Sequence, residues 1–169
     1  MSEKKKLLII GAGQYGKLVR EIAAMTEQYD RIDFIDDNSD IAVGKVEEID
    51  KYKDEYGFAI VAIGNPDIKE KMTDKLLDCG YVIETIIHPK AYVSPSSNIG
   101  IGCVIEANVV INTESVIHDG VFVSAGAVIN HNSVVNSFSH IDCNAVVESN
   151  SVVPEKIKIH SCEVFNSKV

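Results

Sequence analysis

The sequence predicts a chain of two parts, a small α/β domain with a parallel sheet followed by a β-helix of about four coils. In the first part, apolar strand-like runs alternate with helix-like segments, and the glycine-rich turn GAGQYG joins the first strand to the first helix. In the second part, the pattern from residue 91 to 160 repeats with a period of six. A short fixed period is typical of repeat architectures, whereas strands alone have period 2 and helices 3.6. We therefore expect domains at residues 1–87 and 88–169.

Two interleaved series define the repeat. Branched aliphatic residues recur at every sixth position: Val93, Ile99, Ile105, Ile111, Ile117, Val123, Ile129, Val135, Ile141, Val147, Val153 and Ile159. Two positions before each lies a second series, small or valine except at its last member: Ala91, Ser97, Cys103, Val109, Ser115, Val121, Ala127, Ser133, Ser139, Ala145, Ser151 and Ile157. Residues two apart in a strand share a face, so both series should point inward. The Asn, Asp, Ser and Gly between them suit tight corners, and three sides close one triangular coil.

The first part should contain four strands with helices between them. The expected strands are the apolar runs 7–10, 32–35, 58–63 and 81–87. We expect a helix after the glycine turn, a short one at 46–52, and a third that Asn65 caps and Gly80 ends. The third helix should bury Ile68, Met72 and Leu76 on one face. Strand-helix alternation of this kind predicts a parallel sheet with helices packed on it.

The glycine turn has the form of a phosphate cradle. Gly11, Gly13 and Gly16 follow a strand and open a helix, and Asp36 lies 20 residues after Gly16 at the end of the next strand. Glycines let the backbone approach a phosphate, and a helix N-terminus supplies N–H donors. A domain of about 80 residues is roughly one mononucleotide-binding half, so a nucleotide-sugar fits better than NAD. A glycine turn without a ligand is the alternative.

Composition restricts the partners. The net charge of −9 and the pI of about 5.0 argue against nucleic acid and anionic membranes. The four cysteines have no metal-binding spacing, so we expect reduced thiols and no metal. The apolar run at 7–10 is too short for a signal peptide or a membrane span, which predicts a cytoplasmic protein.

Several motifs resemble one enzyme family. GAGQYGK, FIDDN, VAIGNPDIKEKM and IIHPKAYVSPSSNIGIGCVI, in this order before the hexads, resemble the NeuD/PglD-like family of sugar O- and N-acyltransferases. The hexads themselves are similar to those of hexapeptide-repeat acyltransferases, which implies a left-handed β-helix, acetyl-CoA as acyl donor and a homotrimer with active sites between neighbours. The resemblance also implies a Rossmann-like domain that holds a nucleotide-linked sugar, lined by Gly11, Gly13, Tyr15, Gly16, Asp36, Asp37, Gly64 and Asn65.

Two histidines are the candidates for chemistry. The string GAVINHNSVVNSFSHID resembles the family's catalytic coil, in which a His followed by an acid is the base and a His nine residues later contacts the acyl-CoA. The resemblance thus implies His131 as general base and His140 as a donor contact. Histidine suits this task because its pKa lies near neutrality. Asn132 occupies the position of the family's acid, and we expect its carbonyl oxygen to orient the ring.

Lys158 is the best candidate for binding the coenzyme A phosphates, ahead of Lys156 and Lys168. It lies 18 residues after His140, which places it one coil further along the same column. Two functions remain open. The first is an acetyltransferase acting on an amino or hydroxyl group of a sugar. The second is a weakened, shortened relative that serves as a sugar-binding or assembly scaffold, which Asn132 and the loss of the pattern after Ile159 favour.

Overall fold

The computed structural model describes residues 5–167 of the chain. Contacts divide the chain into two compact units, Met1–Glu84 and Thr85–Val169, so the division falls slightly before the expected boundary between residues 87 and 88. Among the described residues, no helix combines the length and the apolar composition that crossing a membrane requires.

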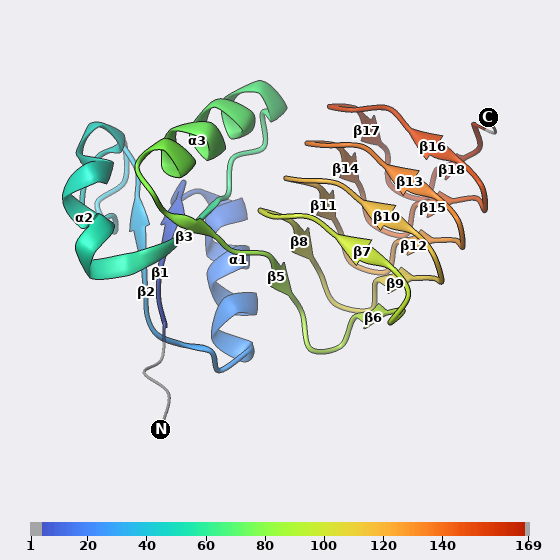
Figure 1. Ribbon diagram of the computed structural model, residues 1–169, viewed down its shortest axis with the longest axis horizontal. Helices are drawn as coiled ribbons and strands as arrows, with labels where there is room; N and C mark the ends of the chain where they lie inside the picture. Colours follow the sequence, from blue (N-terminus) through green and yellow to red (C-terminus); the bar gives the residue numbers. More distant parts are fainter. Residues whose placement is uncertain (1–4, 168–169) are drawn as a thin grey trace. The chain divides into compact units, whose positions relative to one another are not determined.

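The first unit is a parallel sheet with helical crossovers, as predicted (Figure 1). Its strand order is β2-β1-β3-β4, with β1 at Lys5–Ile10, β2 at Tyr29–Ile35, β3 at Gly57–Val61 and β4 at Val82–Ile83. The connections contain α1 (Gln14–Met25), the 3-10 turn η1 (Val46–Glu48), α2 (Ile49–Tyr56) and α3 (Pro66–Asp78). The chain passes from β1 outward to β2 and then back across to β3. The strand order therefore reverses between β1 and β3, the place where α/β sheets bind ligands.

One face of this sheet packs against α2 and α3. The buried cluster on that face comprises Leu8, Ile10, Ile35, Ile49, Tyr56, Ala59, Val61, Leu76, Tyr81 and Ile83. The prediction for α3 was partly wrong, because Ile68 is exposed while Lys69 and Thr73 are buried beside Leu76. Positions 69, 73 and 76 form an equally good helical stripe, and the Thr73 hydroxyl donates to the Lys69 carbonyl at 2.9 Å.

Both predicted ends of α3 are confirmed. The Asn65 side chain accepts the Ile68 N–H at 3.0 Å, which satisfies one of the free donors at the helix start. At the other end, Gly80 has a φ of 82°. The Tyr81 N–H donates to the Leu76 carbonyl at 3.0 Å and the Gly80 N–H to that of Leu77 at 2.8 Å. This is a Schellman motif, and it turns the chain into β4.

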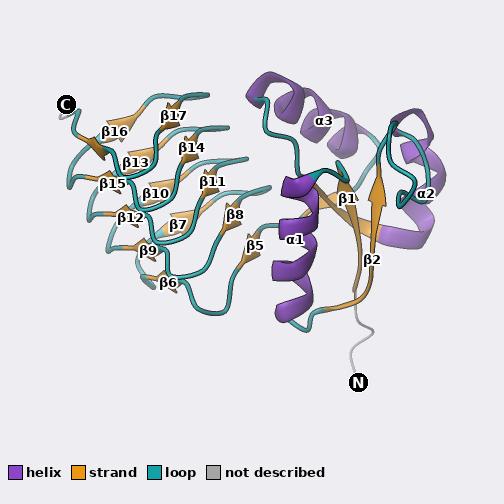
Figure 2. Cartoon of the chain, turned by 180° about the vertical axis from the view of Figure 1, so that it is seen from behind, coloured by secondary structure: helices purple, strands orange, loops and turns teal. Residues whose placement is uncertain are grey.

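The second unit is a parallel β-helix of two-residue strands, stacked coil upon coil in Figure 2. Sheet 1 contains β5 (Ile86–Ile87), β8 (Val104–Ile105), β11 (Phe122–Val123), β14 (His140–Ile141) and β17 (Lys158–Ile159). Sheet 2 contains β6 (Tyr92–Val93), β9 (Val110–Ile111), β12 (Val128–Ile129), β15 (Val146–Val147) and β18 (Val164–Phe165). Sheet 3 contains β7 (Asn98–Ile99), β10 (Val116–Ile117), β13 (Val134–Val135) and β16 (Val152–Val153).

The predicted six-residue register is confirmed. Strands 18 residues apart pair in parallel, so that Phe122, His140 and Lys158 lie in one column of sheet 1. The aliphatic series is buried from Ile105 to Ile159, and Cys103 occupies its small inward position. Ladder hydrogen bonds such as His140 N–H to the Ile157 carbonyl, at 2.9 Å, connect the coils. Each inner coil is therefore stabilised by its two neighbours.

The repeat extends beyond both ends predicted for it. Ile86–Ile87 pairs with β8, so the run 81–87 is not one strand: β4 ends at Ile83 and β5 already belongs to the β-helix. Ile87 precedes Val93 by six residues and so carries the period. At the other end, β18 pairs with β15, which corrects the expectation that the pattern stops after Ile159.

The corners repeat with the same period. Every sixth residue from 102 to 162 has a left-handed backbone with φ between 56° and 73°: Gly102, Asn108, Glu114, Gly120, Gly126, Asn132, Phe138, Asn144, Asn150, Lys156 and Cys162. Glycine and asparagine adopt this conformation at low cost and fill seven of the eleven positions. Asn132 thus meets a backbone requirement of its corner, whatever its part in chemistry.

Candidate functional site

The predicted ligand-binding residues of the first unit gather at the carboxyl ends of its strands. Residues 11–16 follow β1, Asp36 and Asp37 follow β2, and Gly64 and Asn65 follow β3. These strands are neighbours in the sheet, and the strand order reverses between β1 and β3. Both α1 and α3 begin at this edge, so their N-terminal N–H groups favour an anion there.

The glycines at this edge fall into two groups. Gly11 has a φ of 106°, and a Cβ atom there would lie 2.8 Å from the Ala62 carbonyl oxygen. A Cβ atom on Gly16 would collide with the Gly11 carbonyl, so both glycines are required by the fold. At Gly13 and Gly64, no atom beyond the two neighbouring residues of the chain lies within 4 Å of the Cβ position. The fold tolerates a side chain at these two positions, and the open space beside them suits a ligand.

Three other predicted residues have structural hydrogen bonds. The Asp36 carboxylate accepts the Ala12 N–H and the Asn38 N–H, both at 2.8 Å, and so ties the glycine turn to the loop after β2. Asp37 accepts the Val46 N–H at 2.9 Å. Asn65 caps α3. These side chains hold the loops around the open glycines in place.

A hollow of about 510 Å³ lies in the loop after β2, outside most of the predicted set. It is lined by Asp36, Asp37, Asn38, Ser39, Asp40, Ala42, Val43, Gly44, Lys45 and Glu48. Its lining is acidic, and Glu48 is paired with Lys51 at 2.9 Å. Sequence reasoning missed it because the loop has neither a periodic pattern nor a motif.

Tyr15 and Lys69 meet near the start of two helices. Tyr15 lies in the first turn of α1, and the Lys69 amine lies 5.9 Å from the centroid of its ring. Lys69 belongs to the second turn of α3 and is buried. The sequence analysis did not single out Lys69, because a lysine four residues after a helix cap gives no signal of burial.

His131 lies at the exposed corner between β12 and β13. Its Nδ1 atom is 3.2 Å from the Asn132 amide nitrogen, Nδ2. An amide nitrogen is a donor only, so in this orientation Asn132 donates to Nδ1, and a neutral ring then has its proton on Nε2. We had expected the carbonyl oxygen of Asn132 to face the ring. A half-turn of the amide would bring that oxygen to a protonated Nδ1 and leave Nε2 free to accept a proton.

His140 lies on the outer face of sheet 1. Its Nε2 atom is 2.9 Å from the Ser124 hydroxyl oxygen and 3.9 Å from Oδ1 of Asp142. The ring centroids of His140 and Phe122 are 4.7 Å apart, with Phe122 one coil earlier in the same column. A hydroxyl, a carboxylate and an aromatic ring thus surround one imidazole.

Lys158 lies one coil after His140, as the spacing predicted. Its amine is 2.8 Å from Oδ2 of Asp142. The other carboxylate oxygen of Asp142, Oδ1, accepts the Cys143 N–H at 2.8 Å. The hydrogen bond from Lys158 is the main reason that the pKa of Asp142 lies well below its usual range. Lys158 is therefore already paired with a carboxylate. Sequence reasoning missed Asp142 and Ser124. Their 18-residue spacing, which also includes Glu106, would have placed all three in one corner column. Burial raises the pKa of the Glu106 carboxyl.

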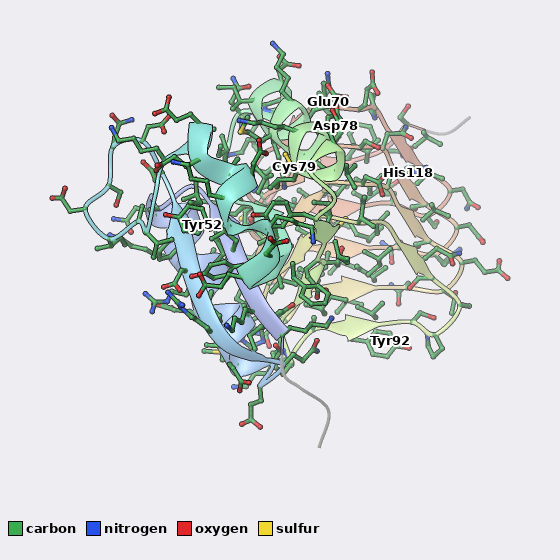
Figure 3. All side chains as sticks on the ribbon, turned by 60° about the vertical axis from the view of Figure 1, so that its left-hand side comes forward. Tyr52, Glu70, Asp78, Cys79, Tyr92 and His118 are labelled. Carbon is green, nitrogen blue, oxygen red and sulfur yellow. The ribbon has the colours of Figure 1, made fainter. Side chains whose placement is uncertain are left out.

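His131 and His140 lie on opposite sides of the coil. His131 occupies the vertex between sheets 2 and 3, whereas His140 lies on sheet 1, the side opposite that vertex. The nine-residue spacing is one and a half sides of a triangle, so a single chain does not bring the two rings together. The remaining histidines offer less: His118 is exposed on the outside of the coils, as is Tyr92 (Figure 3), and His88 accepts the Lys90 N–H at 3.0 Å.

No group of His, Cys, Asp or Glu suited to a metal ion occurs within residues 5–167. The architecture, a parallel α/β sheet followed by a β-helix with a six-residue repeat, is that of the hexapeptide-repeat acyltransferases. A family model for the PglD N-terminal domain matches residues 6–76. The acetyltransferase domain of PglB from Neisseria gonorrhoeae FA1090 is 32% identical, with 94% of this chain and 80% of that chain covered and a TM-score of 0.89. The chain belongs to the PglD-like family of sugar acyltransferases.

Further solved structures agree on the fold. The same PglB domain in complex with acetyl coenzyme A is 34% identical, with the same coverage and a TM-score of 0.88. PerB from Caulobacter crescentus, in complex with CoA and GDP-perosamine, is 23% identical over 90% of each chain, with a TM-score of 0.62. WeeI from Acinetobacter baumannii AYE is 17% identical, covers 85% of this chain and 78% of its own, and has a TM-score of 0.71. The expected fold, a Rossmann-like domain followed by a left-handed β-helix, is confirmed.

Proposed function

We propose that the protein transfers an acetyl group from acetyl-CoA to an amino or hydroxyl group of a nucleotide-activated sugar. The observation that carries this proposal is the likeness to the PglB acetyltransferase domain, whose structure is known in complex with acetyl coenzyme A. Acetyl-CoA supplies an activated thioester. The protein must bind the acceptor, bind the donor and take up the proton that the acceptor loses.

The first unit is proposed to bind the nucleotide part of the acceptor. Open space beside Gly13 and Gly64 lies where the strand order reverses, at the N-termini of α1 and α3. Backbone N–H groups and helix dipoles there favour the negative charge of a diphosphate. The unit is one mononucleotide half, which has one cradle rather than the two that NAD requires.

His131 is the proposed general base. It is exposed at a corner, where an acceptor amine or hydroxyl group can reach its ring. Its Nε2 atom takes the proton as the acceptor attacks the thioester, provided that the proton of the neutral ring resides on Nδ1. The Asn132 amide, which contacts Nδ1, controls that choice. Asn132 is therefore proposed to orient the base.

His140 is the proposed donor contact. It lies outward on sheet 1, and Ser124 fixes its Nε2 atom at 2.9 Å. Lys158, in the next coil of the same column, is a further candidate for the phosphates of coenzyme A. To serve them, its amine would have to leave the Asp142 carboxylate or share it.

We infer from the separation of the two histidines that the active protein is an oligomer, and the resemblance to the hexapeptide-repeat acyltransferases implies a homotrimer. Because His131 and His140 lie on opposite sides of one coil, a site that uses both must draw them from two copies of the chain. The outward column of sheet 2 is apolar throughout, with Tyr92, Val110, Val128, Val146 and Val164. Its ends, Tyr92 and Val164, are 55% and 59% exposed, so the column suits a neighbouring copy. Light scattering should give three times the mass of one chain, and a monomer at micromolar concentration would contradict the shared site.

Calorimetric titration with acetyl-CoA, followed by assay with UDP-amino-sugars, tests the proposal. The transferase should bind acetyl-CoA and release free coenzyme A only when the acceptor is present. A protein that binds a nucleotide-sugar but not acetyl-CoA would instead be the sugar-binding scaffold that Asn132 favours. We also propose a cytoplasmic location, because the apolar run at residues 7–10 is too short for a signal peptide or a membrane span.

A further inference from the structure

His140 lies between groups of opposite charge. Asp142 lies in the same coil as His140, at the corner that follows β14. Lys158 lies next to His140 in the following coil of sheet 1. The two oxygens of the Asp142 carboxylate are divided between them, since Oδ1 lies 3.9 Å from His140 Nε2 and Oδ2 lies 2.8 Å from the Lys158 amine. The carboxylate is thus shared by a permanent cation and a titratable ring.

Asp142 and Lys158 have opposite effects on the protonation of the His140 ring. An ionised carboxylate within about 4–6 Å of an imidazole favours the protonated ring. An ammonium group at a similar distance favours the neutral ring. Lys158 neutralises Asp142 and lies beside His140 in the next coil. It therefore offsets the stabilisation of the protonated His140 ring that Asp142 alone would provide.

Other groups of the β-helix lie near His140 or near its partners. Phe122 covers one side of the ring without charge. Ser124 contacts Nε2 and also reaches Glu106, whose carboxyl is half-buried and accepts the Ala125 N–H at 3.3 Å. Cys143 follows Asp142, and burial raises the pKa of its thiol, which keeps it neutral near pH 7.

We propose that Asp142 and Lys158 form a charge-compensated positioning pair that holds His140 against Ser124 in its neutral form. A neutral ring that donates Nε2–H to Ser124 presents Nδ1 as a lone pair, whereas a charged ring has none. Asp142 and Lys158 act through His140 and are not themselves catalytic residues. The inference rests on the proposed function only in assigning His140 to the donor.

The test is a titration of His140 by two-dimensional ¹H–¹⁵N NMR in the full-length protein, which needs no activity. Lys158→Met should raise the pKa of His140 by about one unit, because Asp142 is then unopposed. Asp142→Asn should lower it by a similar amount. The double variant should return it close to the wild-type value, as expected for two groups that cancel each other.

Lys90→Met serves as a control, since Lys90 is exposed and lies three coils before His140, and it should leave the titration unchanged. The Lys158 side chain is 46% exposed, so Lys158→Met should fold even if Asp142→Asn does not. Shifts of the same sign in the two single variants, or no shift in Lys158→Met, would overturn the proposal. A higher KM for acetyl-CoA in Lys158→Met with an unchanged His140 titration would also overturn it, because it would make Lys158 a phosphate ligand instead.

Discussion

Replacing Asn132 with aspartate should increase the rate of acetyl transfer. The Asn132 amide nitrogen donates to His131 Nδ1 at 3.2 Å, which places the ring proton on Nε2, the atom that must accept a proton. Aspartate offers only acceptor oxygens, so it pairs with a protonated Nδ1 and leaves Nε2 free. The corner also accommodates the change. Its φ is 56°, which aspartate tolerates as asparagine does, and glutamate already occupies the equivalent corner one coil earlier at Glu114.

The magnitude follows from the distance and the exposure. A carboxylate about 3.2 Å from an imidazolium in a solvent-exposed corner gains about 1.3 kcal/mol at the dielectric constant of water. That energy corresponds to roughly a tenfold increase in kcat if it is realised in the transition state. Steady-state assays with acetyl-CoA and UDP-amino-sugars measure it, and Asn132→Glu should act in the same direction.

Asn150→Asp is the matched control, because Asn150 occupies the same corner one coil later, with a φ of 59°. It adds the same charge away from His131 and should leave kcat unchanged. If folded Asn132→Asp is no faster than wild type, or if Asn150→Asp gains as much, the proposed orientation of His131 by residue 132 is wrong.

Two further predictions concern the core and the cradle. Val135→Asp should lower the free energy of unfolding by several kcal/mol, because it buries an unpaired charge between coils. Thr113→Asp, at an exposed corner, should lower it little. Equal melting temperatures of the two variants would contradict the six-residue register. Gly13→Leu should abolish nucleotide-sugar binding in calorimetry and leave the melting temperature nearly unchanged, since its Cβ enters open space, whereas Gly16→Ala should destabilise the first unit. Tight NAD binding by the wild type, with no response to UDP-sugars, would reverse the assignment of this cradle.

The β-helix was predictable because its period is local and repeats without interruption. Each hexad carries its own inward pair, and the 18-residue coil follows from geometry alone. The ends were harder to predict for the same reason. Residues 81–87 read as one apolar strand, although Ile87 already belongs to the repeat, and the large Phe165 did not resemble the aliphatic series that it continues.

The site was only partly predictable. The resemblance to the family's catalytic coil pointed to His131 and His140, but their nine-residue spacing did not show that they occupy opposite sides of the coil. The residues around His140 depend on stacking between coils, and Ser124 and Asp142 become its neighbours only when the chain is folded into columns. In the first unit, the motif identified Gly11, Gly13 and Gly16, and the resemblance added Gly64. Only the structure separates Gly11 and Gly16, which the fold requires, from Gly13 and Gly64, which it does not.

The exchange of His131 for alanine tests the central proposal most directly. If His131 is the base, His131→Ala should lower kcat about 10²–10⁴-fold, the usual contribution of a positioned acid–base group, with little effect on KM. His140→Ala should mainly raise KM for acetyl-CoA. His118→Ala is the control, because His118 is an exposed histidine of the same β-helix and should leave both constants unchanged. Equal rates for wild type and His131→Ala on every UDP-amino-sugar acceptor would contradict the assignment of His131 as the base.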